Sequence, residues 1–251
     1  MKVVAIIQAR MGSTRLPGKV MKEIVDKTVL EHVITRVKQA KGIDEIVIAT
    51  TIKPEDEIIA IESERLGVKV FRGSEEDVLS RYYYAAKGNN ADIVIRITSD
   101  CPLIDPEIID SIIYRFKKLY KGNKVDYLSN TLERTFPRGL DVEIFSFKIL
   151  EESFYNGEEK YQREHVTPYI YENPQKFKLL GHTSEIDYSN HRWTLDTQED
   201  FELITKIYEG LYSDDKLILF NDIVKYLSLY PEYMQINATI NQRELRGQYN
   251  G

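Results

Sequence analysis

The chain has 251 residues, 42% of them hydrophobic, and its 34 basic and 40 acidic residues give a net charge of −6. This balance argues against broad nucleic-acid binding, which needs an extended basic surface. A single cysteine, Cys101, excludes an internal disulfide and a cysteine-rich metal site, so we expect a protein of the reducing cytoplasm. We expect no membrane span, because the apolar runs are short, and no secretory signal, because a strand follows directly on Met1-Lys2.

Apolar runs alternate with helical patterns along the first half of the chain. Five of these runs are rich in β-branched residues or bounded by turn signals, and they predict strands. Apolar residues at helical spacing, such as Leu30, Val33 and Val37, predict helices that pack on a sheet. The alternation predicts an α/β fold, a Rossmann-like, mostly parallel sheet flanked by helices. The predicted strands are Val3–Gln8, Glu45–Thr50, Val68–Phe71, Asp92–Thr98 and Val125–Ser129.

Several helix starts are marked by a hydroxyl and an acid three residues apart, which cap each other's backbone groups. Asp105-Pro106 marks another start, with a capping acid and a first-turn proline. These signals predict helices between the strands and a late helix at Asp200–Tyr212. The hydroxyl and acid pairs are Thr28 with Glu31, Ser74 with Asp77, and Thr197 with Asp200.

A basic loop, Gln8–Lys19, follows the first predicted strand. Gly12 and Gly18 let its backbone approach a ligand closely, and Ser13 supplies a hydroxyl. Ligands of open α/β sheets bind at the carboxyl ends of strands, so the loop predicts a phosphate site, with a surface turn of solvated bases as the alternative. It lacks the Walker and dinucleotide glycine patterns. The first 22 residues contain no acid, and their bases are Lys2, Arg10, Arg15, Lys19 and Lys22.

Two aspartates follow predicted strands elsewhere in the chain. Asp100 comes after Asp92–Thr98, and Asp196 comes after a predicted strand at Arg192–Leu195. Taken singly, the first is explained as a turn acid before a proline and the second as a helix cap. Together they predict a cation clamp, because hard oxygen ligands at strand ends suit Mg²⁺ on a triphosphate. A metal and bases at a phosphate are the minimum for nucleotidyl transfer.

The βα rhythm is lost between Asn130 and about Asn190. We expect one domain, residues 1–251, with an inserted α+β subdomain at 130–190 that forms a substrate lid, a dimer contact, or both. Within it, Phe136–Phe147 predicts strands around a Pro-Arg-Gly turn, followed by helical stretches. The tail after Met234 is polar, and we expect it to be loosely attached.

Other polar residues are candidates for ligand contacts, although structural roles explain them equally well. Two follow the third predicted strand and are candidates for contact with a base or phosphate, namely Arg72 and Ser74. Four lie in the insertion and are candidates for recognising the acceptor substrate, namely Arg138, Asp141, Glu143 and His165. The four histidines are scattered singly, which argues against a histidine metal site.

Three motifs resemble those of the cytidylyltransferases that make CMP-activated sugar acids, and most closely the spore coat polysaccharide branch. They are Gln8-Ala-Arg-x-x-Ser-x-Arg-Leu-Pro-Gly-Lys19, Asp100-Cys-Pro-Leu-Ile and Leu195-Asp-Thr-Gln-Glu-Asp200, in matching order from residue 1 to about 212. The resemblance implies a nucleotide-diphospho-sugar transferase type of fold. It implies that Arg10 and Lys19 bind the triphosphate, Ser13 supports the loop, Asp100 and Asp196 hold Mg²⁺, and Arg72 helps recognise cytosine. We add Ala9, Gly12, Arg15 and Ser74 to the nucleotide-binding set.

The expected reaction transfers CMP from CTP to an acidic sugar or another small anionic acceptor and releases pyrophosphate, for surface polysaccharide synthesis. The family also implies a homodimer. Ser99 replaces a glycine of the best-known members, and Thr194 replaces an acid of the sialate enzymes, which leaves the acceptor open. The alternatives are a glycosyltransferase of similar fold, although its pair of aspartates separated by one residue is missing around Asp100, and a non-catalytic nucleotide-binding subunit.

Overall fold

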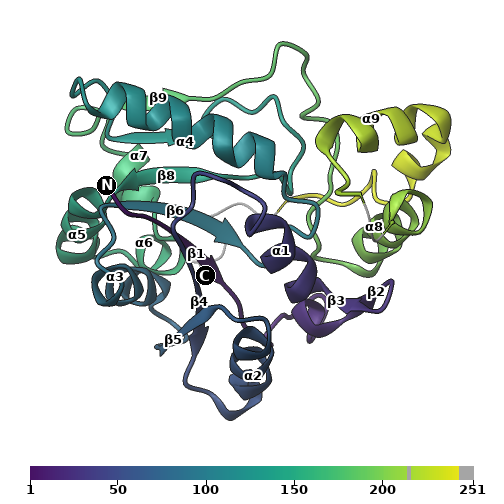
Figure 1. Cartoon of the computed structure of the whole chain (residues 1–251), viewed down its shortest axis with the longest axis horizontal. Helices are drawn as coiled ribbons and strands as arrows, with labels where there is room; N and C mark the ends of the chain where they lie inside the picture. Colours follow the sequence, from purple (N-terminus) through teal and green to yellow (C-terminus); the bar gives the residue numbers. More distant parts are fainter. Residues whose placement is uncertain (214–215, 243–251) are drawn as a thin grey trace.

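A seven-stranded sheet forms the centre of the computed structural model, which describes residues 1–213 and 216–242 (Figure 1). The strand order is β5-β4-β1-β6-β8-β7-β9; the first four run parallel, whereas β8 is antiparallel to β6 and β7. The predicted mostly parallel α/β fold is confirmed, and the five strands predicted between residues 3 and 129 shift only at their ends. The strands are β1 (Val3–Gln8), β4 (Glu45–Thr51), β5 (Lys69–Gly73), β6 (Ile93–Thr98), β7 (Tyr127–Ser129), β8 (Glu143–Ser146) and β9 (Leu179–Gly181).

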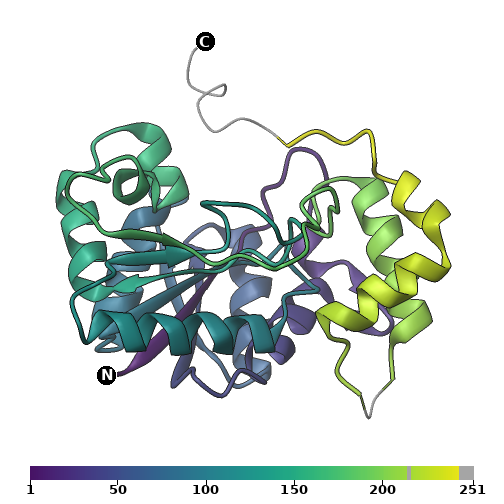
Figure 2. The same cartoon turned by 90° about the horizontal axis from the view of Figure 1, so that it is seen from above.

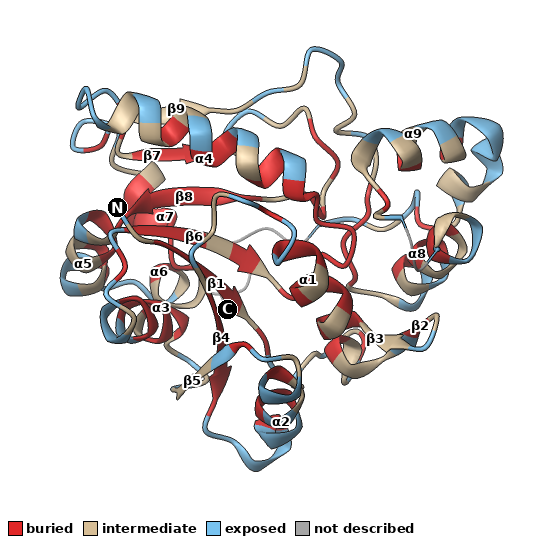
Figure 3. Cartoon of the chain, viewed as in Figure 1, coloured by how far each residue is buried: buried red, intermediate tan, exposed pale blue. Residues whose placement is uncertain are grey.

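Helices cover both faces of the sheet, as the unbroken apolar run of β1 requires. Ala5 and Ile7 pack into the core on one face, and Val4 and Ile6 pack into the core on the other. The first face packs against α1, α2 and α4, and the second against α3, α5 and α7, so the central strands are buried (Figure 3). The helices are α1 (Val29–Val37), α2 (Glu57–Arg65), α3 (Val78–Gly88), α4 (Pro106–Tyr120), α5 (Phe147–Asn156), α6 (Lys160–His165) and α7 (Pro168–Tyr171).

Most helix starts are capped as predicted, by Thr28, Asp105 and Thr197. Ser74 does not cap a helix. The helix α3 begins at Val78, and Asp77 caps it by accepting a hydrogen bond from the Ser80 amide at 2.8 Å. The Ser74 hydroxyl instead accepts from the Asp77 amide at 3.2 Å, which fixes the turn before the helix.

The segment 130–190 supplies two strands, β8 and β9, to the main sheet, together with the helices α5, α6 and α7. The helices α5 and α6 contact α3. Of the expected strands in Phe136–Phe147, only β8 forms. The residues before it follow a loop held by Asn130, whose side chain donates to the Leu140 carbonyl at 2.7 Å and accepts from the Val142 amide at 2.9 Å.

The C-terminal part, α8 (Gln198–Leu211), α9 (Phe220–Leu229) and a 3-10 turn at Pro231–Gln235, lies at one side of the sheet (Figure 2). The predicted strand at Arg192–Leu195 is wrong, because only an isolated bridge joins Arg192 to Arg138. The tail after Met234, which we expected to be loosely attached, is held at Asn237, which is only 4% exposed, whereas its other residues as far as Gln242 are exposed or half-buried. The rest of that tail lies outside the described residues. None of the described helices is long and apolar enough to cross a membrane.

Candidate active site

Internal hydrogen bonds fold the basic loop back on itself. The amides of Ser13 and Gly18 both donate to the Met11 carbonyl oxygen, at 2.9 and 3.1 Å. The Ser13 hydroxyl accepts from the Leu16 amide at 3.4 Å. Gly18 has a φ of +66°, in the left-handed region that glycine adopts without strain. The chain therefore turns sharply at Gly18, immediately before Lys19.

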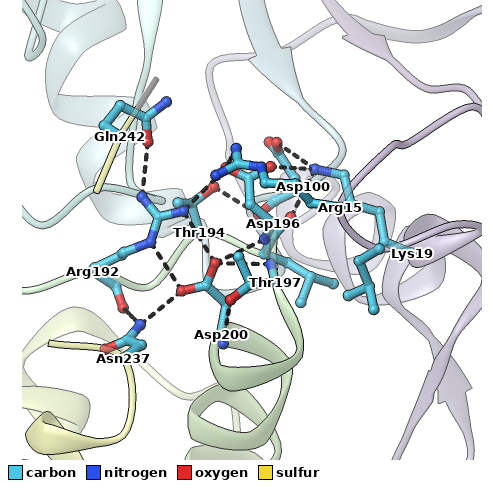
Figure 4. A network of polar contacts seen from close by, with 12 residues as sticks. Arg15, Lys19, Asp100, Arg192, Thr194, Asp196, Thr197, Asp200, Asn237 and Gln242 are labelled. Carbon is cyan, nitrogen blue, oxygen red and sulfur yellow. Dashed lines mark hydrogen bonds and ion pairs between the residues drawn. The ribbon is translucent and has the colours of Figure 1, made fainter. Parts of the chain in front are cut away.

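Lys19 lies between the two predicted aspartates (Figure 4). Its Nζ lies 2.9 Å from Asp100 Oδ2 and 2.7 Å from Asp196 Oδ1, and it donates to the Leu195 carbonyl oxygen at 2.7 Å. Arg15 Nη2 lies 2.9 Å from the other oxygen of Asp196, Oδ2. The structure therefore brings two bases of the first loop together with two acids from distant parts of the chain.

Backbone bonds bring the two aspartates to the same place. The Asp100 carbonyl oxygen accepts from the Leu195 amide at 2.8 Å and from the Thr194 hydroxyl at 3.3 Å. The Thr98 hydroxyl, at the end of β6, donates to Asp100 Oδ1 at 2.6 Å. Thr98 and Thr194 are residues that sequence reasoning missed, and Thr98 had a signal, since it is a polar residue at the end of an apolar strand.

Burial and charge oppose each other at this centre. Burial alone would lower the pKa of Lys19, but the charges of Asp100 and Asp196 outweigh it, and the pKa is raised. Burial alone would raise the pKa of Asp100, but the Lys19 charge and the hydrogen bond from Thr98 hold it below its ordinary value. Both groups therefore remain ionised at neutral pH.

The oxygens around Lys19 suit a hard divalent cation. Carboxylate oxygens of Asp100 and Asp196 and the Leu195 carbonyl oxygen converge on the Lys19 ammonium, so a positive charge is stable there. Mg²⁺ typically binds through one or two carboxylates together with substrate phosphates. In residues 1–213 and 216–242, no group of three or more His, Cys, Asp and Glu is placed to hold a metal. Two carboxylates and one carbonyl oxygen match the protein ligands of a cation that the phosphates of a substrate also bind.

Arg10 contacts a different partner. Its Nη1 lies 3.4 Å from Glu75 Oε1, and its side chain is 42% exposed. Gly12 lies beside the same carboxylate, because a Cβ there would lie 3.4 Å from Glu75 Oε1. Ala9 is buried, and its amide donates to the Ala49 carbonyl at 3.3 Å. Arg10 and Gly12 therefore line the β5 side of the loop, while Arg15 and Lys19 reach the aspartates.

Arg72 is held by its own protein. Its Nε donates to the Thr51 carbonyl at 2.9 Å, its Nη2 donates to the Lys53 carbonyl at 3.1 Å, and its Nη1 pairs with Glu57. Ser74 bonds to the turn before α3. Neither residue contacts the Lys19 centre in this structure, although Arg72 lies in β5, one residue before its end, and Ser74 directly follows that strand at the carboxyl edge of the sheet.

Asp141 and Glu143 each face an arginine that sequence reasoning missed. Arg134 contacts both oxygens of Asp141, at 2.7 and 2.9 Å. Arg96 pairs with Glu143, which also accepts from the Tyr127 hydroxyl at 2.8 Å. Arg96 had a signal, because a charge that interrupts an apolar strand needs a buried partner. Arg134 had none, because its partner is fixed by the path of the loop.

His165 and Arg138 lie in different surroundings. Burial, with a smaller effect of the Arg96 charge, lowers the pKa of His165 to about 4, and its Nε2 has no hydrogen-bond partner in the described part of the chain. Burial and the charges of Arg134 and Arg192 lower the pKa of Arg138, with Asp141 acting in the opposite direction. Arg138 also lines a cavity of about 420 Å³ between residues 189–193 and 234–242.

Comparison with known proteins identifies the family of the chain. The sequence pattern of the cytidylyltransferase family matches residues 4–223. The spore coat polysaccharide biosynthesis protein SpsF of Bacillus subtilis is 35% identical over 214 residues, 82% of this chain and 86% of that protein. The structure of a cytidylyltransferase from Leptospira borgpetersenii has a TM-score of 0.89 at 40% identity, covering 96% of this chain and all of that one.

A more distant structure shares the fold. It is CMP:2-keto-3-deoxy-manno-octonic acid synthetase complexed with CTP, which has a TM-score of 0.63 at 19% identity and covers 84% of this chain and 99% of that one. The family match over most of the chain and the similarity to SpsF confirm the resemblance that the motifs indicated. The chain belongs to the cytidylyltransferase family.

Proposed function

We propose that this cytidylyltransferase transfers CMP from CTP to a hydroxyl of an acidic sugar or a related small anionic acceptor, in the cytoplasm, the compartment that holds CTP. The convergence of Lys19, Asp100 and Asp196 beside the basic loop is the observation that carries the proposal. A bond forms between the acceptor oxygen and the α-phosphorus while the bond from that phosphorus to the β-phosphate breaks, and pyrophosphate leaves. Similarity to SpsF supports a role in surface polysaccharide synthesis.

The residues of the loop bind and orient the triphosphate in this proposal. Arg10, Arg15 and Lys19 supply positive charge, and the backbone near Gly12 and Ser13 approaches the phosphates. Lys19 exchanges its carboxylate partners for phosphate oxygens when CTP binds. Asp100 and Asp196 would hold Mg²⁺, which would supply positive charge to neutralise the reacting and leaving oxygens. Rate enhancement then comes from positioning and from charge stabilisation, and no protein nucleophile is required.

The acceptor lies on the side of the sheet where β8 follows β6. Arg138 binds its acidic group, because no acid contacts this guanidinium in the described residues and Arg134 adds charge nearby. We assign Asp141, Glu143 and neutral His165 to its hydroxyl groups.

We also propose that segment 130–190 pairs two copies of the chain. Light scattering should give twice the 29.3 kDa of one chain, and a monomeric mass would refute the pairing.

A pyrophosphate-release assay with CTP, Mg²⁺ and a panel of sugar acids and sugar phosphates tests the reaction. We expect release with CTP and at least one acid. Asp100→Ala and Asp196→Ala should abolish pyrophosphate release. Asp187→Ala should not, because Asp187 is exposed and is not one of the two aspartates that contact Lys19. A preference for ATP or GTP would contradict the assignment of cytosine as the nucleobase. An active Asp100→Ala protein would refute the metal role of Asp100.

Two other outcomes separate the alternatives. Hydrolysis of CMP- or UDP-sugars without pyrophosphate release would indicate a glycosyltransferase. Tight CTP binding without turnover on any acceptor would indicate a non-catalytic subunit.

A further inference from the structure

The chain returns to the candidate active site near its C-terminal end, beyond residues 4–223 that the family pattern covers. Asn237 is buried, and its Nδ2 donates to the Arg192 carbonyl oxygen at 2.9 Å and to Asp200 Oδ1 at 2.8 Å. Gln242 Oε1 accepts from Arg192 Nη1 at 2.8 Å (Figure 4). A segment that the family pattern does not include therefore holds two side chains behind Asp196.

Arg192 and Asp200 connect this segment to Asp196. Arg192 contacts both oxygens of Asp200, with Nε to Oδ1 at 2.9 Å and Nη2 to Oδ2 at 3.0 Å. Asp200 Oδ2 also accepts from the amides of Asp196 and Thr197, at 3.0 and 3.1 Å. Arg192 Nη2 donates in addition to Asp196 Oδ2 at 3.1 Å. One ion pair therefore holds both the backbone and the side chain of Asp196.

The ion pair needs its outer partners. Asp200 is fully buried and Arg192 is 8% exposed, so donors and acceptors left without partners there are costly. The Asn237 amide supplies a further donor to the pair, and Gln242 supplies the acceptor for Nη1, the one nitrogen of the guanidinium that does not face an aspartate. With all three nitrogens bonded, the guanidinium is fixed in one orientation.

We propose that Asn237 and Gln242 are positioning residues that hold Asp196, through Arg192 and Asp200, in the geometry that binds the divalent cation. The inference rests on the proposed function. Groups behind metal ligands commonly alter metal affinity by about 10- to 100-fold when they are removed. Among residues 1–213 and 216–242, the Asn237 side chain makes two hydrogen bonds and is buried, whereas that of Gln242 makes one and is exposed, so Asn237 carries the larger share.

Binding of Mn²⁺, followed by electron paramagnetic resonance in the presence of a non-hydrolysable CTP analogue, tests the positioning without turnover. We expect Asn237→Ala to weaken Mn²⁺ binding by about 10-fold or more and Gln242→Ala by several-fold. Thr239→Ala is the matched control, because Thr239 is exposed in the same segment, and it should bind Mn²⁺ like the wild type.

Conservative variants separate positioning from folding. Gln242→Glu keeps an acceptor oxygen for Arg192 and should retain Mn²⁺ binding. Asn237→Asp loses the donor and places a carboxylate against the Arg192 carbonyl and Asp200, so it should bind no better than Asn237→Ala. Circular dichroism shows which variants are folded. If the Asn237 variants do not fold, the Mn²⁺ affinity of a folded Gln242→Ala protein is enough to test the positioning role.

The outcomes also separate this inference from the proposed function. If Asp196→Ala weakens Mn²⁺ binding but folded Gln242→Ala and Asn237→Ala proteins bind normally, the positioning role is wrong and the metal role stands. If Asp196→Ala binds Mn²⁺ as well as the wild type, the metal role itself is wrong, and the positioning role falls with it.

Discussion

Lys19 and Asp196 stand 177 positions apart in the sequence, and the Lys19 ammonium lies 2.7 Å from Asp196 Oδ1. The same ammonium lies 2.9 Å from Asp100 Oδ2, so one positive charge holds two carboxylates together. Carboxylates this close repel each other when the charge between them is removed. Arg15 and Arg192 also contact Asp196, but Lys19 is the base that contacts both carboxylates. We therefore propose that a cation bound to phosphate replaces the Lys19 charge when a ligand draws Lys19 away.

Lys19→Met should lower kcat/KM for CTP by about 100-fold or more, because it removes charge stabilisation at the reacting phosphates. It should also increase the rise in Tm that Mn²⁺ causes in the absence of nucleotide, since the ammonium no longer competes for the carboxylates. Lys22→Met is the matched control. Lys22 is also a base of the first 22 residues, but its ammonium lies 5.1 Å from the centre of the Phe201 ring rather than beside the two aspartates. An equal Mn²⁺ response in both variants would contradict the competition.

Gly139→Ala should destabilise the protein by about 3 kcal/mol or more, because overpacking against backbone is among the costliest changes. Gly139 has a φ of +105°, and a Cβ there would lie 2.5 Å from the Trp193 carbonyl carbon and 2.7 Å from the Thr194 nitrogen. Urea unfolding measures the loss. Gly88→Ala, where no atom lies within 4 Å of the added Cβ, should be neutral or stabilising. Similar effects of the two changes would overturn this account.

The histidines should make the protein less stable in acid. Burial lowers the pKa of His32 and of His165 to about 4, whereas the unfolded chain titrates near ~6.5. The unfolded state therefore binds more protons between these values, and stability that is complete above pH ~6.5 is lost as the pH falls toward about 4. Each residue accounts for about 2 kcal/mol between pH ~7 and ~5.

Urea unfolding at these two pH values measures the loss. His165→Gln should reduce it by the share of one histidine, because glutamine does not titrate. An unchanged dependence on pH in that variant would show that His165 is already charged in the folded protein.

Arg81→Met should be neutral or stabilising by about 1–2 kcal/mol, since an apolar side chain replaces a buried guanidinium with two unpaired nitrogens in the described residues. Arg81 is 2% exposed, and its Nε and Nη1 have no hydrogen-bond partner in the described residues. Arg36→Met is the contrast. Arg36 is equally buried but donates to three carbonyl oxygens, of Leu103, Ile104 and Ile218, so its loss should cost about 3 kcal/mol or more. Equal losses in urea unfolding would show that Arg81 has a partner.

The sheet and the residues that begin the site could be predicted because their signals are local. A parallel strand buried on both faces is an apolar run, and β1 has the predicted boundaries, Val3–Gln8. Asp100 and Asp196 were found because each follows a predicted strand, although the strand predicted before Asp196 does not form. The structure places both beside Lys19, since the Leu195 amide bonds to the Asp100 carbonyl.

The errors concern interactions between distant parts of the chain. Arg192–Leu195 has the composition of a strand, but its backbone bonds to a loop and to Asp100, so no ladder forms. The tail was expected to be loose because it is polar. The sequence did not reveal the burial of Asn237, because that burial depends on Arg192 and Asp200, 45 and 37 positions away. Polarity alone does not distinguish a solvated segment from one whose polar groups are paired in the interior.

The strand order has a consequence for how the reaction can change during evolution. The chain passes from β1 to β4 and β5 on one side, then crosses back to β6 on the other side of β1. The connections after β1 and β6 therefore diverge, and such a topological switch point is where ligands bind in open α/β sheets. Arg10 and Arg72 belong to the half that β4 and β5 build, whereas Asp141 and Glu143 belong to the half of β8 and β7. With the proposed assignment of these residues to the nucleotide and to the acceptor, acceptor preference can diverge in one half of the sheet while the nucleotide half stays the same.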